Sequence, residues 1–232
     1  MPRAVRRMVT ATVEYGVARA GIGAVRVLDK DVIGQAHHPR GAAGSVTAWE
    51  MAHRPSNRQR NRWVVSLLNV QPADRVLEIG FGPGLAIAGL ARAGAGHVFG
   101  IDHSDVMLRQ ASKRNAAAIR AGRVTLIRAS ADHLPPALNG PFDVIVAVNS
   151  LGFWPAPAER LAELRQRPAP GGRIAIVSQP RCPGATAATS RSAADEIESQ
   201  LRDAGLTHLT TETLALSPPV VCVLAASPSR LP

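Results

Sequence analysis

The chain has 232 residues, 46% of them apolar, and a formal net charge of +10 at pH 7. This length suffices for one sizeable core and a short extension, so a second full domain is not expected. No apolar run approaches the roughly 20 residues that a membrane-spanning helix requires, and the two cysteines lack metal-ligand or disulfide spacing, which predicts a metal-free cytoplasmic protein without a transmembrane segment.

The first 62 residues carry most of the positive charge, with eleven Arg or Lys against four acids. One interpretation is attraction to nucleic acid or anionic lipid; the other, which we favour, is a solvated arginine-rich surface. Three glycines weaken a single continuous helix here, and the segment lacks the features of a secretory leader. We therefore predict a basic extension over residues 1–45, helical or partly mobile, followed by one domain over residues 46–232.

A polar helix is predicted next, with Ser56 as its N-cap and Leu68 near its end. It leads directly into a short apolar strand that contains an acid, Glu78. Helix and strand patterns then alternate in the manner of right-handed βαβ crossovers, which predicts a mostly parallel sheet.

The first strand runs into a loop with three closely spaced glycines, Gly80, Gly82 and Gly84. A buried parallel strand needs such glycines when it turns sharply into a helix beside a ligand, because they let the backbone approach that ligand. The spacing is one residue shorter than a dinucleotide fingerprint, and Pro83 removes an N–H that would help to bind a pyrophosphate. The loop therefore favours a cofactor without phosphate.

The second apolar segment, residues 97–101, ends in another acid, Asp102. A carboxylate at this place can accept both hydroxyls of a ribose. Residues 142–150 read as the fourth strand, because an unbroken apolar run buried on both faces ends in polar residues.

The C-terminal part changes pattern. A helix is predicted over residues 192–204, and two strands over residues 207–214 and 220–225. Their short connection favours antiparallel pairing. Cys222 lies within the last apolar run and is expected to be a buried structural thiol.

These ordered motifs resemble those of the class I S-adenosylmethionine-dependent methyltransferases, from about Arg54 to the C-terminal strand. Residues 124–135 resemble the family's third strand and adenine-edge loop, and residues 164–177 resemble its helix, its Pro-Gly-Gly turn at residues 170–172 and its fifth strand. The resemblance implies S-adenosylmethionine, which carries no phosphate, as the cofactor, and residues 46–232 as the methyltransferase domain. It also implies an α/β fold: a Rossmann-like three-layer sandwich with a mostly parallel seven-stranded sheet and an antiparallel C-terminal strand.

The resemblance assigns cofactor contacts to the ends of the first four strands. Asp102 would hold the ribose, and His103 and Met107 would lie near the adenine. The family usually carries Asp where this chain has Ser130, so Asp132 is the candidate substitute at the adenine edge. The full predicted cofactor set is Glu78, Gly80, Gly82, Gly84, Asp102, His103, Met107, Ser130, Ala131, Asp132 and Asn149.

In similar enzymes the residues before the first strand fold over the cofactor. His53, Arg54, Asn57 and Arg58 are therefore candidates for contacts to the cofactor carboxylate or to substrate, and an ordinary polar helix face is the alternative. Displacement at a sulfonium needs alignment and exclusion of water, so a base is optional. His53 is the candidate base, with a surface histidine as the alternative.

Asn149, at the end of the fourth strand, is the second candidate catalytic residue. Enzymes that methylate base amines or glutamine amides carry an Asn/Asp-Pro-Pro-aromatic motif at this place. Here Leu151 to Trp154 follow without a proline, so that class of acceptor is disfavoured. Gln179 and Arg181, just after the fifth strand, are candidates for the acceptor side. The sequence thus predicts an enzyme that transfers a methyl group to an oxygen or nitrogen of a small metabolite.

Two alternatives stay open. The first is an RNA or lipid methyltransferase that uses the basic N-terminal segment to hold phosphate. The second is a non-catalytic module that binds S-adenosylmethionine, and the presence of Ser130 favours this alternative.

Overall fold

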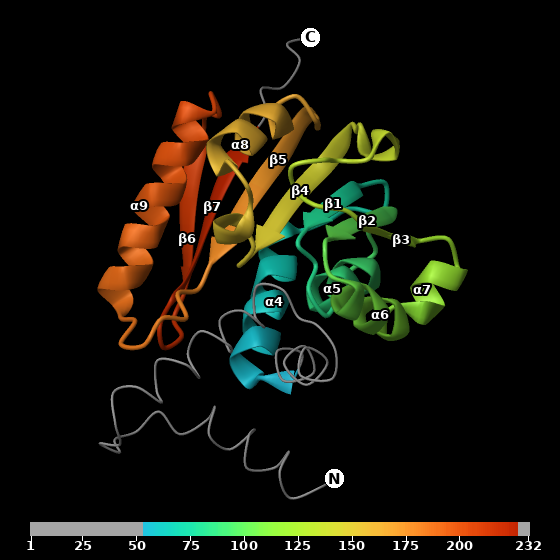
Figure 1. Cartoon of the computed structure of the whole chain (residues 1–232), viewed down its shortest axis with the longest axis horizontal. Coiled ribbons are helices and arrows are strands. Elements are labelled where there is room, and N and C mark those ends of the chain that lie inside the picture. The colour runs from blue at the N-terminus through green and yellow to red at the C-terminus, as the bar shows by residue number, and fades with distance from the viewer. Residues whose placement is uncertain (1–52, 227–232) are drawn as a thin grey trace, which may run out of the picture. The chain divides into compact units, whose positions relative to one another are not determined.

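The computed structural model describes residues 53–226, which build a seven-stranded sheet in the order β3-β2-β1-β4-β5-β7-β6 (Figure 1). The strands from β3 to β5 in that order pair in parallel, and β7 pairs antiparallel with both β5 and β6. This topology confirms the predicted Rossmann-like α/β fold with an antiparallel C-terminal strand. The predicted extension over residues 1–45 lies outside the described residues.

The strands alternate with helices along the chain. The strands are β1 (Arg75–Ile79), β2 (His97–Asp102), β3 (Val124–Arg128), β4 (Phe142–Val148), β5 (Pro168–Ser178), β6 (Leu209–Leu214) and β7 (Val220–Ala226). The helices are α4 (Pro55–Leu68), α5 (Leu85–Arg92), α6 (Asp105–Arg114), α7 (Ala116–Arg120), α8 (Pro157–Leu164) and α9 (Ala187–Asp203). Two single-turn 3-10 helices, η1 (Pro136–Leu138) and η2 (Leu151–Phe153), flank β4.

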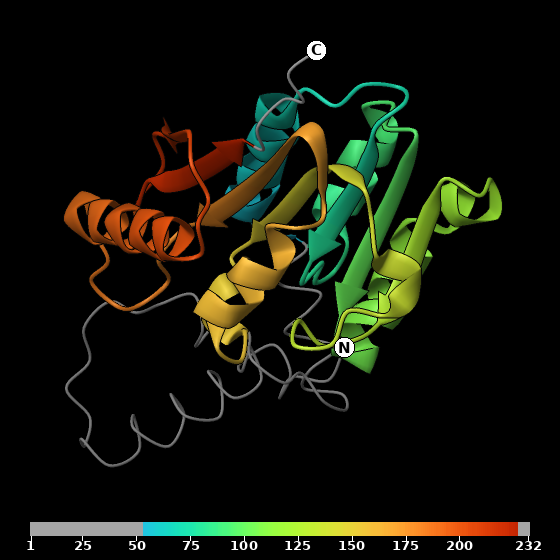
Figure 2. The same ribbon diagram turned by 90° about the horizontal axis from the view of Figure 1, so that it is seen from above.

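Helices cover both faces of the sheet, with α8 and α9 on one face and α4 to α7 on the other (Figure 2). The central strand β4 shows why both faces close. Val144, Val146 and Val148 point to the α4 to α7 side, whereas Ile145 and Ala147 point to the α8 and α9 side, because side chains alternate along a strand. Within residues 53–226, no helix is both long and apolar enough to cross a membrane.

The starts of α4 and β5 differ from those predicted. The residue that caps α4 is Arg54 in extended conformation, not Ser56, because Pro55 occupies the first helical position, where its fixed φ and missing N–H cost nothing. β5 begins at Pro168, so the predicted turn at residues 170–172 is part of an irregular first half of that strand.

Helix α9 begins at Ala187, five residues earlier than the predicted start at Ser192. Thr186 and Thr189 form a reciprocal capping box. The N–H of each threonine donates to the hydroxyl of the other, at 3.1 Å for the Thr186 N–H and 3.5 Å for the Thr189 N–H. The paired caps satisfy two N-terminal donors and fix the earlier start.

The predicted terminal hairpin is confirmed. β6 and β7 pair antiparallel from Leu209 opposite Ala225 to Leu214 opposite Val220. Cys222 is fully buried in β7, as predicted, and burial raises the pKa of its thiol to about 12.

Candidate functional site

The three glycines of the loop after β1 all have positive φ, and they serve two different purposes. A Cβ at Gly80 would lie 2.4 Å from Ser150 Cβ, and one at Gly84 would lie 2.8 Å from Ala111 Cβ. A Cβ at Gly82 would meet nothing within 4 Å. Gly80 and Gly84 are therefore required for packing, whereas Gly82 borders open space into which a ligand can fit.

The end of α6 holds the glycine loop in place. Arg114 Nε donates to the carbonyl of Pro83 at 2.8 Å, and Asn115 Nδ2 donates to the carbonyl of Gly84 at 3.3 Å. Both contacts join residues 31 positions apart in the sequence. Sequence reasoning missed these two residues, since no local pattern links them to the loop.

Asp102 connects β2 to the same loop. Its Oδ2 accepts the N–H of Gly82 at 2.9 Å, and its Oδ1 accepts the N–H of Ser104 at 2.9 Å. Burial raises the pKa of Asp102, and these two hydrogen bonds together with the nearby His103 oppose that rise. The carboxylate is fixed in orientation, and each oxygen keeps a lone pair for a further donor.

Glu78 is the more deeply buried of the two acids, with 2% of its surface exposed. Its Oε2 has no hydrogen-bond partner within residues 53–226. Burial raises the pKa of Glu78 well above its ordinary value and the charge of Asp102 adds to the rise, whereas the N–H of Ile87 and the charge of Arg60 oppose it. An unsatisfied buried carboxyl oxygen beside the loop suits a cationic donor from a ligand.

The residues predicted to lie near the adenine differ in their exposure. His103, next to Asp102, is exposed. Met107 is 4% exposed and packs into the core, so it offers little surface to a ligand. Residues 130–132 are half-buried. Oδ1 of Asp132 is buried without a hydrogen-bond partner in the described part of the chain, and the Ser130 side chain lowers the pKa of Asp132. Asp132 is thus the residue with a free acceptor in this loop.

Asn149 stands at the end of β4 in the left-handed conformation, with φ of 53°. Its Nδ2 donates to the carbonyl of Gln179 at 2.9 Å, and its Oδ1 accepts the N–H of Gln179 at 2.7 Å. Its neighbour Ser150 donates to the carbonyl of Ile79 at 2.6 Å. The two residues join the ends of β1, β4 and β5. Both Oδ1 and Nδ2 of Asn149 form hydrogen bonds to the backbone of Gln179.

Helix α4 brings polar side chains to this end of the sheet. Gln179 Oε1 accepts from Arg60 Nη1 at 3.2 Å and from Arg181 Nη2 at 2.6 Å. Arg181 Nη2 also donates to Asn57 Oδ1 at 2.6 Å. His53, just before the helix, is exposed, as is Arg58. The structure therefore brings Asn57 together with the two predicted acceptor-side residues, Gln179 and Arg181.

Arg60 was missed by sequence reasoning, although a signal for it exists. The inner face of α4 is formed by residues at helical spacing: Asn57, Arg60, Asn61, Val64 and Leu68, all buried. Arg60 is 7% exposed and its Nε has no partner within residues 53–226. Polar residues on the apolar stripe of an amphipathic helix mark a place where the helix faces a polar ligand or network instead of a core.

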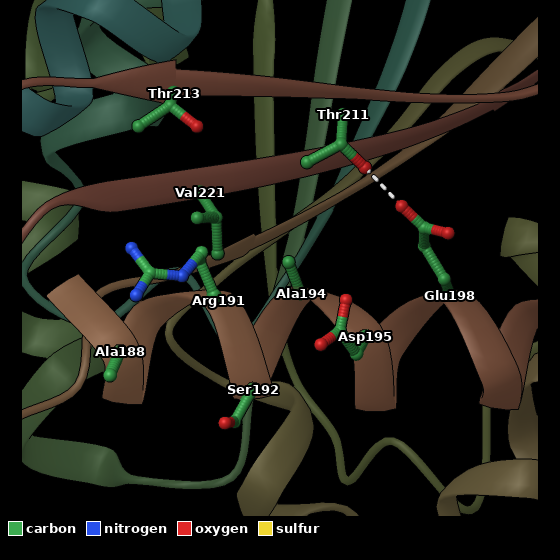
Figure 3. Close-up of a pocket in the computed structure, with 9 residues that line it drawn as sticks. All are labelled: Ala188, Arg191, Ser192, Ala194, Asp195, Glu198, Thr211, Thr213 and Val221. Atoms are coloured by element: carbon green, nitrogen blue, oxygen red, sulfur yellow. Dashed lines mark hydrogen bonds between the residues drawn. The ribbon is translucent and has the colours of Figure 1, made fainter.

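A separate hollow of about 360 Å³ lies between α9 and the β6–β7 hairpin (Figure 3). Its lining includes charges of both signs from α9, and Glu198 accepts a hydrogen bond from the Thr211 hydroxyl at 2.6 Å. In the order of the strands, β4 and β5 separate this hairpin from β1 and its glycine loop. The hollow is therefore not part of the site around Glu78 and Asp102.

Comparison with known proteins identifies a domain in the middle of the chain. A family model described as a methyltransferase domain matches residues 76–172, which include both acids and the glycine loop. An uncharacterized methyltransferase of Bacillus subtilis (strain 168), YdaC, is 32% identical over 99 residues, covering 42% of this chain and 52% of that protein. The chain thus spans about half the length of this curated relative.

Solved structures share the fold at low sequence identity. N-methyltransferase NodS from Bradyrhizobium japonicum WM9, solved with S-adenosyl-L-homocysteine, has a TM-score of 0.60 at 19% identity over 78% of this chain and 92% of NodS. The [4+2]-cyclase SpnF has a TM-score of 0.61 at 19% identity over 76% of this chain and 84% of SpnF. At these identities the likeness concerns the fold alone.

Proposed function

We propose that the chain is a class I S-adenosylmethionine-dependent methyltransferase that transfers a methyl group to an oxygen or nitrogen of a small metabolite. The match of residues 76–172 to a methyltransferase domain and the similarity to an uncharacterized methyltransferase support this proposal. One observation carries this proposal. Two buried acids, Glu78 in β1 and Asp102 at the end of β2, lie next to the glycine loop. Asp102 accepts the N–H of Gly82, and an added Cβ at Gly82 would meet nothing within 4 Å.

The residues present fit the chemical groups of the cofactor. The unsatisfied Oε2 of Glu78 suits the cofactor ammonium, and the oriented carboxylate of Asp102 suits the ribose hydroxyls. The buried, unpartnered Nε of Arg60 suits the cofactor carboxylate. Asp132, with its free Oδ1, suits the adenine amino group.

When bound, the cofactor supplies an electrophilic methyl group on a sulfonium. The protein's part is to align the acceptor with that methyl group and to exclude water. Asn149 and Ser150 fix the ends of β4 and β5, so they position the acceptor side through the backbone. His53 stays the candidate base, in the segment that leads into α4.

Calorimetric titration with S-adenosylmethionine and S-adenosylhomocysteine, with NAD as the control ligand, tests the proposal. We expect micromolar binding of the first two and none of NAD. Asp102→Asn should weaken binding by about 10- to 100-fold, since hydrogen bonds to charged groups contribute about 1.5–3 kcal/mol. Asp195→Asn, an exposed change on α9, is the matched control and should bind like the wild type. Failure of a folded sample to bind either ligand would contradict the proposal.

The alternatives differ in what supports them. A role in RNA or lipid methylation depends on the basic segment before residue 53, which lies outside the described residues. A non-catalytic role would leave cofactor binding intact without turnover. An acceptor screen in metabolite extracts, with His53→Ala to test for a base, separates these cases from the proposed enzyme.

A further inference from the structure

Two guanidinium groups meet at the end of β5 on a single neutral atom. Arg60, from α4, and Arg181, just after β5, both donate to Oε1 of Gln179. Gln179 is 1% exposed, and its own position is fixed by Asn149 and by a hydrogen bond from its Nε2 to the carbonyl of Pro218 at 3.0 Å. The amide oxygen therefore holds both arginines in place but gives them no negative charge.

This arrangement leaves positive charge uncompensated. Burial and the neighbouring charges of Arg181 and Arg54 lower the pKa of Arg60 to about 9, and burial and Arg54 lower the pKa of Arg181 to about 10. Neither Arg60 nor Arg181 has a carboxylate within salt-bridge distance among residues 53–226. Glu78 is the one acid that raises the pKa of Arg60, and its own pKa is raised by burial.

The cofactor would supply a negative charge to only one of the two arginines, because its single carboxylate is assigned to Arg60 and leaves Arg181 without an anion. S-adenosylmethionine carries a sulfonium, an ammonium and a carboxylate, so it brings one net positive charge into a site whose acids are Glu78 and Asp102. With Arg60 and Arg181 ionised, the loaded site stays positive. A second anion is therefore favoured once the cofactor is bound.

We propose that Arg181, backed by Arg60, binds an anionic group of the methyl acceptor, a carboxylate or a phosphate. This inference rests on the proposed methyltransferase function and narrows its substrate class. Arg181 suits this role because all its hydrogen bonds within the described residues use Nη2, at 2.6 Å to Asn57, 2.6 Å to Gln179 and 3.3 Å to Ser56. Its Nε and Nη1 form no hydrogen bond within residues 53–226 and can make a two-point contact with an oxyanion.

The position of Arg181 separates this group from the cofactor. Gln179 follows β5, and β4 lies between β5 and β1, so Arg181 starts two strands from the strand that carries Glu78, or about 10 Å at the usual strand spacing. Glu78 contributes to the pKa of Arg60 but is not among the causes of the shift at Arg181. The guanidinium of Arg181 is partly buried by its hydrogen-bond partners, but the residue as a whole is exposed, so a ligand can reach it from solvent.

The test uses the full chain loaded with S-adenosylmethionine in the absence of a methyl acceptor, because S-adenosylhomocysteine lacks the positive sulfonium. At constant ionic strength, the loaded protein is titrated with inorganic phosphate and, separately, with malonate. We expect saturable binding of at least one of the two anions, and Arg181→Gln should weaken this binding at least tenfold. Arg181→Lys should be intermediate, because lysine keeps the charge but lacks the planar guanidinium that makes a two-point contact. Arg191→Gln removes the same charge from an exposed site on α9 and should bind the anion like the wild type.

Each other outcome overturns the proposal. The anion site is rejected if neither anion shows saturable binding, or if Arg181→Gln and Arg191→Gln weaken binding equally. The proposed methyltransferase function is unaffected by either result as long as S-adenosylhomocysteine still binds. If Arg181→Gln weakens S-adenosylhomocysteine tenfold but not 5′-methylthioadenosine, which lacks the carboxylate, Arg181 contacts the cofactor instead. Absence of S-adenosylhomocysteine binding in the wild type contradicts the proposed function itself.

Discussion

The side-chain amide of Asn149 and the backbone of Gln179 exchange two hydrogen bonds, of 2.9 and 2.7 Å, across the ends of β4 and β5. Gln179 in turn holds Arg60 and Arg181 through its own side chain. The position of both arginines therefore depends on a residue that touches neither of them. Within the proposed function, Asn149 acts as a positioning residue for the acceptor side.

Asn149→Ala should lower the free energy of unfolding by about 1–3 kcal/mol. The substitution leaves the backbone N–H and carbonyl of the buried Gln179 without their partners, and alanine also adopts positive φ less readily than asparagine. Denaturant unfolding measures the change. Asn69→Ala is the control, since Asn69 shares the left-handed conformation at an exposed site. Equal losses in the two variants would mean that the hydrogen bonds to Gln179 contribute nothing.

Gly82→Ala and Gly84→Ala should separate ligand binding from stability. Gly82→Ala places a methyl group in the open space of the loop, so it should abolish binding of S-adenosylhomocysteine at a stability cost of about 1 kcal/mol. Gly84→Ala should destabilise the protein by more, because its Cβ would lie 2.8 Å from Ala111 Cβ. Calorimetry and thermal unfolding measure the two effects.

The control for both glycine variants is Gly122→Ala. Gly122 has φ of 68°, and a Cβ added there would meet nothing within 4 Å, so this change introduces a similar backbone strain far from the loop in sequence. It should bind the ligand normally. Wild-type binding by Gly82→Ala would show that the cofactor does not approach this glycine.

Glu78→Gln should stabilise the unliganded protein at neutral pH. The folded-state pKa of Glu78 lies above the unfolded value of 4.5, so the folded state binds the proton more tightly than the unfolded state does. The resulting contribution to the free energy of unfolding is fully present below about pH 4.5. It is lost as the pH rises through the folded pKa, where a buried carboxylate must ionise. Glutamine never ionises, so the melting temperature of the variant should exceed that of the wild type increasingly as pH rises above 4.5.

Thermal unfolding from pH 4.5 to pH 8 measures this difference, and about 2–4 °C corresponds to each kcal/mol in a chain of this size. Glu196→Gln, an exposed change on α9, should follow the wild type. A variant of Glu78 that is less stable at pH 8 than at pH 5, relative to the wild type, would reverse the assigned sign.

Cofactor binding should release protons from Glu78. The pKa of Glu78 is raised in the free protein, and an ammonium placed beside its Oε2 would favour the ionised form. Titration with S-adenosylhomocysteine at pH 7 in Bis-Tris and in Tris, whose ionisation enthalpies differ, counts the protons. We expect net release by the wild type and none by Glu78→Gln. An identical proton count in both proteins would assign the release to another group.

The glycine loop and the two acids could be predicted because their signals are local. Positive φ requires glycine at a given position, and an acid at the end of an apolar run stands at the end of a buried strand wherever the chain folds. The network around Gln179 could not be predicted in the same way. Arg60 and Gln179 lie 119 residues apart, and only the strand order brings them together.

Side-chain direction was the other feature beyond reach of the sequence. Met107 follows Asp102 at the predicted spacing, yet α6 turns it into the core and leaves His103 exposed. Ser104 caps α6 by accepting the N–H of Met107 at 3.4 Å, and this cap fixes the rotation of the helix. The spacing did not predict which of these two side chains would be buried.

The antiparallel insertion of β7 has a consequence for synthesis on the ribosome. The chain emerges with β6 before β7, yet β7 occupies the position between β5 and β6. Until residues 220–226 leave the exit tunnel, the outer edge of β5 has unpaired backbone from Arg173 to Ser178, and β6 has no strand beside it. A nascent chain stalled at this point would present an apolar strand edge to other chains and to chaperones. The pairing of β7 completes the sheet and at the same time covers this edge against aggregation.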